Sequence, residues 1–536
     1  MDAIVIGAGP NGLVAANILV DRGWSVVVLE EQPQPGGAVK TAELTVPGFK
    51  HDVFSAFYPL AKASPAMTAL ELERWGLRWR TAPAALAHAS REGVAPMIWC
   101  DLTRTVEGLE RIAPGDGEAW AGLYEQWARI GGDVVRSLLA PFPPVAGPLR
   151  LAVSLRRDLL RFLRTTLLPV RRLTEEGFPG TLAGLLLAGN ALHADLTPEM
   201  TLSGFFGYLL CALGQEHGYP VPEGGAGELT HALVRRLESK GGRVECNARV
   251  VQIDVHKGRA AGVRTSDGQV HPVRKAVLAD VSATALYRDL VASEHLPNRV
   301  LEDVARFQFD NGTVKVDWAL NRPCPWSVED IGSAGTIHIA DDMNHLTDMS
   351  TGLAQGRVPA RPCLVVGQMN AADPGRSPEG TTTMWAYAHV PQAITHDESG
   401  VISGAWNDRE REAFADRMEA EIEGHAPGFR DAIAGRHVMA PPDLERANRN
   451  LVGGAVNGGT SQLHQQLVFR PIPGLGRAET PVRGLYLASA SAHPGGGVHG
   501  ACGANAARAA LIAGRSRKVV AATSAVAAAR AIKKRS

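Results

Sequence analysis

The chain has little cysteine, no excess of charge of either sign and no long apolar run, and each of these absences excludes a class of protein. Its 536 residues include six cysteines, which form no Cys-x-x-Cys pair and no zinc-ligand spacing. We therefore expect neither a disulfide framework nor a dithiol redox centre, and no metal site. Lys and Arg number 55 together, as do Asp and Glu, so net charge does not indicate a nucleic-acid-binding protein. No stretch reaches 18 consecutive apolar residues, so we expect no membrane-spanning helix.

The rest of the composition is that of a soluble globular protein. Apolar residues make up 45% of the chain and charged residues 21%, a balance that allows a sizeable core. The length corresponds to one large domain or to two or three ordinary ones. A strand-like segment at residues 3–6 follows directly on Met1 and Asp2, which leaves no room for an export leader. We therefore expect a cytoplasmic protein.

The first thirty residues contain the strongest motif. A buried strand at 3–6 is followed by Gly7-Ala8-Gly9-Pro10-Asn11-Gly12, a helix-like run and a second apolar strand that ends in Glu30. This is the Gly-x-Gly-x-x-Gly fingerprint in the strand–turn–helix–strand context that dinucleotide binding requires. Gly7 permits the tight turn, Gly9 lets the backbone approach a pyrophosphate, and Gly12 lets the helix pack closely on the strand. The carboxylate of Glu30 is placed to accept a hydrogen bond from the adenosine ribose, and it disfavours a 2′-phosphate there.

Two further glycine-rich loops favour FAD over NAD. Gly36 and Gly37, followed by Ala38, come soon after the ribose-binding acid, where the backbone can approach the far side of a longer cofactor. Near the other end of the chain, a strand at 484–488 leads into three consecutive glycines and then into an Ala-rich, helix-like run at 501–513. A helix that begins after such a loop suits an anion or a polarised carbonyl at its N-terminus. Loops at opposite ends of the chain can thus wrap one extended cofactor between them.

Seven segments, in this order, carry a resemblance to a known family. They are GAGPNG (7–12), VLEEQPQPGGA (28–38), PGFKHD (47–52), EGGAGELTHAL (223–233), GGRVECNARVVQI (241–253), VFRPIPGLGRAETPVRGLYL (468–487) and GLYLASASAHPGGGVHGACGANAA (484–507). In them the chain resembles flavin-dependent amine oxidase-like proteins, specifically the branch of phytoene desaturases, carotenoid isomerases and retinol saturases. The resemblance implies an α/β fold with a Rossmann-like, GR2-type FAD-binding domain and an inserted α+β substrate domain.

The resemblance also implies which residues bind the cofactor. The positions that correspond to the family's FAD-binding residues are Gly7, Gly9, Pro10, Asn11, Gly12, Glu30, Glu31, Gly36, Gly37, Ala38, Val250, Val498, Gly500 and Ala501. Val250 would meet the adenine through its backbone, and the helix that begins near Val498 to Ala501 would direct its N-terminus at the flavin. Ala38 departs from the family, since many relatives have an arginine there. Cys502 is expected to be a packing residue.

The resemblance further implies a discontinuous FAD-binding domain. It would comprise residues 1–75, 220–290 and 455–515, with residues 76–219 and 291–454 as the substrate domain and residues 516–536 as a basic, Ala-rich tail. Local patterns within the second FAD segment predict a helix over 228–240, a strand over 243–253, a hairpin turn at 266–269 and a strand over 275–280.

Residues 149–173 predict a basic amphipathic helix. Leu155, Leu159 and Phe162 recur at helical spacing, and the segment contains seven Arg and one Asp. Such a helix can lie on an anionic membrane surface, where a nearby entrance suits a lipophilic substrate. A solvated helix of the substrate domain is the alternative.

The sequence shows no catalytic triad, and a flavin dehydrogenase needs little beyond a positioned C–H bond and a dry pocket. His51, His493 and His499 are the candidate catalytic side chains, and a structural role is the alternative for each. We predict an FAD-dependent oxidoreductase that desaturates a largely apolar small molecule by hydride transfer to flavin N5, with oxygen or a quinone as electron acceptor. Isomerisation or saturation of a polyene, amine oxidation, and a non-catalytic, FAD-binding regulatory role stay open.

Overall fold

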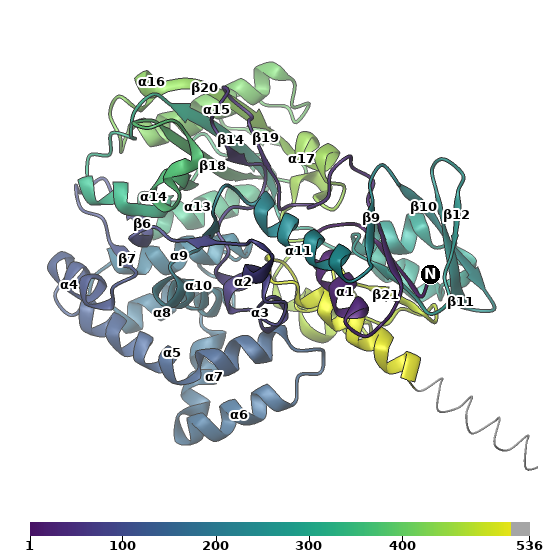
Figure 1. Ribbon diagram of the computed structural model, residues 1–536. Coiled ribbons are helices and arrows are strands. Elements are labelled where there is room, and N and C mark those ends of the chain that lie inside the picture. Colours follow the sequence, from purple (N-terminus) through teal and green to yellow (C-terminus); the bar gives the residue numbers. More distant parts are fainter. Residues whose placement is uncertain (516–536) are drawn as a thin grey trace, which may run out of the picture.

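A parallel five-stranded sheet lies in the right-hand part of Figure 1, near the N-terminus. The structure is a computed structural model that describes residues 1–515. In spatial order the strands of this sheet are β21 (Leu485–Leu487), β13 (Ala276–Ala279), β1 (Ala3–Ile6), β2 (Val26–Leu29) and β9 (Arg243–Glu245). Four of the five strands are buried along their whole length, as expected of short apolar strands covered on both faces. The predicted tail at 516–536 lies outside the described residues.

Helices cover one face of this sheet and a small antiparallel sheet covers the other. Helices α1 (Pro10–Val20) and α11 (Gly227–Ser239) share one apolar core with β1, β2 and β13. The opposite face packs against a three-stranded sheet, whose strands are β10 (Val250–His256), β11 (Arg259–Thr265) and β12 (Val270–Pro272). This layering confirms the predicted Rossmann-like α/β fold.

The strand predicted over 243–253 is wrong as one element, because the chain divides it between two sheets. β9 ends at Glu245 and pairs with β2, whereas β10 begins at Val250 and pairs with β11. Asn247 between them has a φ of 56°, a left-handed conformation that a strand interior does not contain. The other predictions in this segment are confirmed, since β11 and β12 form a hairpin around residues 266–269 and β13 lies within 275–280.

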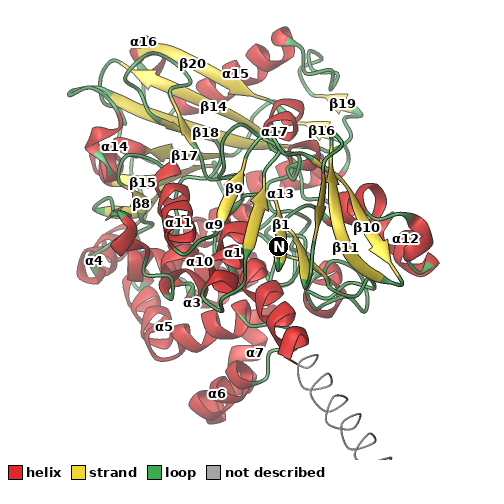
Figure 2. Ribbon diagram, turned by 45° about the vertical axis from the view of Figure 1, so that its right-hand side comes forward, coloured by secondary structure: helices red, strands yellow, loops and turns green. Residues whose placement is uncertain are grey.

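A second, seven-stranded sheet lies at the top of Figure 2. In spatial order its strands are β20 (Ile433–Met439), β14 (Gly312–Leu320), β18 (Thr382–Val390), β17 (Leu364–Gln368), β15 (Ala334–Ile339), β6 (Ala84–Ala89) and β7 (Met97–Trp99). Their pairings are antiparallel except that between β15 and β6. One face packs against α15 (Asp408–Glu423) in an apolar core. The predicted domain boundaries stay a prediction.

A layer of helices lies below this sheet in Figure 2. Its members are α4 (Leu102–Ile112), α5 (Asp116–Leu139), α6 (Ala146–Leu155), α7 (Leu159–Leu167), α8 (Val170–Gly177), α9 (Leu182–His193) and α10 (Ser203–His217). Buried side chains of β6 and β7 share a core with these helices. Among residues 1–515, no helix combines the length and the apolar character that crossing a bilayer requires.

The helix predicted over 149–173 is wrong as one element. α6 ends at Leu155, a 3₁₀ turn covers Arg156–Asp158, and α7 begins at Leu159. Arg156 has a φ of 45°, which no α-helix accommodates. Leu155 and Phe162 are buried in the core, so the predicted apolar face packs against the protein.

Candidate functional site

The first two glycine loops touch each other at the N-terminus of α1. Gly9 is the N-cap of α1 and has no side chain of its own to cap the helix. A Cβ atom on Gly37 would lie 2.9 Å from the Cα of Gly9, and one on Gly12 would lie 2.1 Å from the carbonyl oxygen of Gly7. Only glycine fits at these positions. The contact leaves the N-terminus of α1 at the junction of the two loops, where an anion is favoured.

Two cavities meet at this junction. Gly9, Gly37 and Asp280 line both a cavity of about 150 Å³ and a larger one of about 370 Å³. The predicted cofactor residues that line the smaller cavity are Gly7, Gly9, Glu30, Glu31, Gly37 and Val250. Those that line the larger cavity are Gly9, Pro10, Asn11, Gly37, Ala38 and Val498. The two cavities therefore adjoin each other at the carboxyl ends of the parallel strands, where ligands of such folds bind.

Four of the predicted cofactor residues, Gly12, Gly36, Gly500 and Ala501, line neither cavity. A Cβ atom on Gly500 would lie 2.7 Å from a methyl group of Val14, so this glycine allows close packing on α1. The amide of Ala501, at the start of the helical run 501–515, donates a hydrogen bond of 3.0 Å to Nδ1 of His499. That amide is therefore already paired with a side chain.

The carboxylate of Glu30 is held in place at the end of β2. It accepts hydrogen bonds from the amides of Ala8, at 2.7 Å, and Gln32, at 2.9 Å. Lys40 lies on the same cavity, and burial lowers its pKa although Glu30 and Glu31 act in the opposite direction. The sequence analysis missed Lys40, whose place shortly after the glycine pair was the available signal. Its ammonium can offset phosphate charge.

Asp280 is the second residue that sequence reasoning missed. It follows β13, and its Oδ2 accepts a hydrogen bond of 2.8 Å from the amide of Gly12. Burial raises the pKa of Asp280, the Gly12 amide lowers it and the charge of Glu30 raises it, which together bring the pKa to about 7. An acid directly after a buried strand of a Rossmann-like sheet was the available signal, because that edge carries the ligand site.

The site fits a flavin dinucleotide on its own geometry. The side-chain oxygen of Asn11 is buried, has no hydrogen-bond partner among the described residues, and belongs to a residue of the larger cavity. The N-terminus of α1 suits a pyrophosphate, and Glu30 lies on the smaller cavity, where a ribose hydroxyl can reach it. The helix N-terminus, the carboxylate of Glu30 and the unpaired amide oxygen of Asn11 are the features that fit an extended dinucleotide.

The three candidate catalytic histidines have different surroundings in the structure. His499 lines the larger cavity. Its Nδ1 accepts a hydrogen bond from the amide of Ala501, so the proton of the neutral ring is on Nε2. Neither ring nitrogen is then available as a general base. Burial lowers the pKa of both His499 and His493 to about 4, which makes both neutral at pH 7. His493 does not line either cavity and packs edge-on against Phe142. His51 is buried 3.4 Å from a carboxylate oxygen of Asp317.

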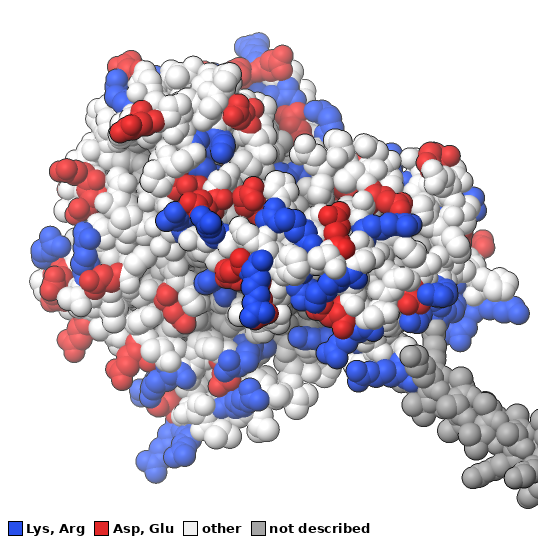
Figure 3. Space-filling view, viewed as in Figure 1, with Lys and Arg blue, Asp and Glu red and all other residues white. Residues whose placement is uncertain are grey.

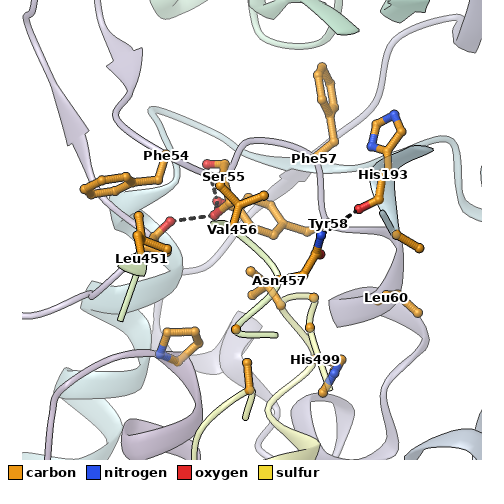
Figure 4. A pocket seen from close by; sticks show the side chains of 18 of the residues that line it. Phe54, Ser55, Phe57, Tyr58, Leu60, His193, Leu451, Val456, Asn457 and His499 are labelled. Carbon is orange, nitrogen blue, oxygen red and sulfur yellow. Dashed lines mark hydrogen bonds between the residues drawn. The ribbon is translucent and has the colours of Figure 1, made fainter. Parts of the chain in front are cut away.

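The walls of the larger cavity are mainly aromatic and aliphatic. Phe54, Phe57, Tyr58 and Leu60 come from the segment after the second glycine loop, and Figure 4 shows them with Asn457 and His499 around the space. Other apolar wall residues are Leu138 and Leu139 of α5 and Phe206, Leu209 and Leu210 of α10. A cavity with such walls binds an apolar body and excludes water.

The strands of the larger sheet supply a polar part of the same cavity. Thr313 and Lys315 of β14, Thr336 of β15, and Trp385 and Tyr387 of β18 line it. The sequence analysis missed them, although residues 313–318 and 384–389 alternate between apolar and polar or aromatic side chains, which is typical of a strand with two different faces. Nothing in the sequence shows that both faces are buried.

Comparison with known proteins identifies the family. The family described as flavin containing amine oxidoreductase matches residues 11–511. The chain belongs to this family. It is 27% identical to pyridine nucleotide-disulfide oxidoreductase domain-containing protein 2 of Mus musculus, over 94% of this chain and 92% of that protein. It is 25% identical to phytoene desaturase (lycopene-forming) of Pseudescherichia vulneris, over 95% of this chain and 98% of that one.

A solved structure confirms the fold. An oxidoreductase from Methanosarcina mazei superposes with a TM-score of 0.60 at 17% identity, over 95% of this chain and all of that one. The predicted resemblance to the amine oxidase-like family and its phytoene desaturase branch is confirmed, and so are the predicted cofactor and class: this family member is an FAD-dependent oxidoreductase. The individual cofactor contacts stay predictions.

Proposed function

We propose that this flavoprotein dehydrogenates a carbon–carbon bond of a largely apolar small molecule held in the larger cavity. The observation that supports the proposal is the position of that cavity, which adjoins the predicted dinucleotide site at Gly9 and Gly37. Its volume is about 370 Å³, and the flavin end of the cofactor would occupy the part that Pro10, Asn11, Ala38 and Val498 line. Within the described part of the chain, Asp280 and Lys315 are the only charged side chains in its lining, so most of the substrate surface would meet apolar walls.

The protein's share of the chemistry is to bind, to orient and to exclude water. When bound, FAD would supply the hydride acceptor at N5, and we propose oxygen or a quinone as the electron acceptor. The aromatic and aliphatic walls would hold the reacting C–H bond against the flavin side of the cavity. His499 positions the loop before the helical run 501–515 through its bond to Ala501, and we assign it no proton transfer.

Anaerobic reduction of bound flavin tests the proposal. FAD-loaded protein is mixed with a panel of terpenoids, lipids and amines, and the absorbance of oxidised flavin is followed. We expect bleaching with an apolar terpenoid or lipid and the appearance of a product with one more double bond. A flavin that dithionite reduces but that no member of the panel bleaches contradicts the proposal and favours a non-catalytic FAD-binding protein.

Two enzymatic alternatives are outcomes of the same experiment. Conversion of a polyene only when the flavin is reduced beforehand identifies an isomerase or a saturase. Bleaching by amines alone identifies an amine oxidase.

A further inference from the structure

The side chain of Arg470 is a cation that lies wholly inside the protein. It is 0% exposed, and within residues 1–515 all six of its hydrogen bonds go to backbone carbonyl oxygens, those of Asn457, Gly459, Thr460 and Ala490. It forms no ion pair with an acid in that part of the chain. A buried charge without a carboxylate partner is costly, and its field is screened far less than that of a charge at the surface.

Arg470 stays charged at pH 7. Burial lowers its pKa to about 10, while Cys502 and Asp310 act in the opposite direction. The carboxylate of Asp310 does not contact the guanidinium, because it accepts hydrogen bonds from three backbone amides of the loop 456–459. The acid therefore binds the amides of that loop and the guanidinium binds its carbonyl groups, so the loop separates the two charges.

The guanidinium lies directly behind one wall of the larger cavity. Its Nη2 donates to the carbonyl oxygens of Ala490, at 2.7 Å, and Asn457, at 3.2 Å, and both residues line the cavity. A Cβ atom on Gly495 would lie 3.1 Å from Cζ of Arg470, so the side chain also touches the glycine-rich loop that leads to Val498. That loop borders the part of the cavity where the flavin end of the cofactor is expected.

The charge of Arg470 also acts at the surface of the cavity. His499 lines the cavity, and although burial is the main cause of its lowered pKa, the charge of Arg470 lowers that pKa as well. A cation that disfavours positive charge at this wall favours negative charge there, because the Coulomb energy changes sign with the charge.

From this geometry we infer that Arg470 stabilises negative charge on the flavin end of the bound cofactor and thereby raises its reduction potential. Two electrons and one proton, the equivalent of one hydride, give a neutral flavin ring one net negative charge, and a charge near the ring is one means by which a protein tunes a flavin. A fixed charge in a dry site acts strongly, since no solvent has to reorganise around it. Arg470 is thus a positioning residue that acts through the cavity wall. The inference concerns the cofactor and holds whichever substrate the cavity binds.

The midpoint potential of bound FAD, measured by slow anaerobic reduction against a reference dye, tests the inference. The wild type needs no variant: its potential should lie above that of free FAD, because the cation favours the reduced ring. In Arg470→Met, which removes the charge, the ratio of reduced to oxidised flavin at a given potential should fall at least about tenfold, a shift of about 30 mV for a two-electron couple. Arg470→Lys keeps a cation, so we expect less than half of that shift.

Ser491→Ala is the matched control, because it removes a contact between the same two loops without a change of charge. The hydroxyl of Ser491 donates to the carbonyl oxygen of Gly458 at 2.9 Å, and this bond joins the loop after β21 to the loop 456–460, as Arg470 does. We expect the control to have the midpoint potential of the wild type. Retained flavin absorbance and a cooperative melting transition show that each variant folds.

A wild-type potential at or below that of free FAD would overturn the inference, as would an unchanged potential in Arg470→Met. An equal fall in Ser491→Ala would overturn it too, since loop structure would then set the potential. If Arg470→Met does not retain FAD, the wild type and Arg470→Lys decide, and a full tenfold loss in the lysine variant counts against the inference. A potential that follows the charge, in a protein whose flavin no substrate reduces, would support the role of Arg470 while contradicting the proposed function.

Discussion

Asp280 places a carboxyl group where a pyrophosphate is expected. It lines both cavities at their junction, and a Cβ atom on Gly9 would lie 2.8 Å from its Oδ2. Burial and the neighbouring Glu30 raise its pKa to about 7. A bound diphosphate brings further negative charge, which disfavours the carboxylate form still more. Asp280 therefore suits the cofactor best as a neutral acid, which can donate a hydrogen bond to a phosphate oxygen.

This assignment predicts the pH dependence of FAD binding. Below pH 7 the protonated acid dominates, and above pH 7 the carboxylate repels the diphosphate, so affinity should fall by up to about tenfold for each further pH unit. Asp280→Asn should abolish most of this fall. The dissociation constant of FAD, measured by fluorescence quenching between pH 6 and pH 8.5, checks the prediction.

Lys40 provides the matched control, because it is the titratable cation on the same cavity. Lys40→Gln should weaken FAD binding at every pH and keep the fall above pH 7. An Asp280→Asn protein with the slope of the wild type would show that another group controls the titration.

At the scale of elements, α6 and α7 expose apolar side chains other than Leu155, Leu159 and Phe162, on which the sequence analysis based its amphipathic helix. The exposed apolar side chains of this α6–α7 surface are Val145, Leu149, Val153, Leu160, Leu163 and Leu167. No ion pair involves Arg150, Arg156, Arg157 or Arg161 within residues 1–515. In Figure 3, uncharged atoms and Lys or Arg side chains occupy the lower edge of the molecule, over α6. Exposed apolar and cationic side chains together are typical of a helix that lies on an anionic membrane.

We expect the α6–α7 surface to bind anionic vesicles. The triple variant Leu149→Ser, Val153→Ser and Leu160→Ser should lose most of the sedimentation with phosphatidylserine vesicles, because it removes apolar area that the acyl region would bury. Val270→Ser is the control, since Val270 is about half exposed on the distant β12. High salt should weaken the binding of the wild type, as screening reduces its electrostatic part. Wild-type protein that stays in the supernatant at low salt would contradict the prediction.

Local sequence could predict the helices and strands whose pattern of apolar residues is compatible with only one type of secondary structure. Residues 3–6 and 26–29 are short apolar runs on either side of a glycine fingerprint, and the structure contains both strands. The change of sheet at Asn247 and the helix break at Arg156 depend on left-handed residues that the apolar pattern does not reveal. The polar wall at Lys315 depends on a helix layer covering the sheet, which no single segment encodes. The sheet change, the helix break and the polar wall all depend on tertiary contacts, which local sequence does not show.

At the scale of the whole molecule, the cofactor site depends on bringing both ends of the chain together. β1 and β21 lie in one sheet on either side of β13, although β1 starts at residue 3 and β21 ends at residue 487. The two cavities are lined by segments near residues 9, 37, 250, 280 and 450. Asn450 joins two of them, since its side chain donates to the carbonyl of Asp280 and accepts from the amide of Ser282. A ligand in the site therefore contacts segments that sequence separates by hundreds of residues.

This arrangement predicts that FAD stabilises distant segments together. At a free concentration of 100 times its dissociation constant, FAD should raise the free energy of unfolding by about 2.7 kcal/mol. Hydrogen exchange should show added protection at residues 7–12, 36–38, 248–250 and 447–451, because each segment borders the cavities. The exposed hairpin at 266–269 serves as the internal control and should exchange at the same rate with and without FAD. Protection confined to residues 7–38 would mean that the cofactor binds the N-terminal βαβ unit alone, and the extended site across the two cavities would then be wrong.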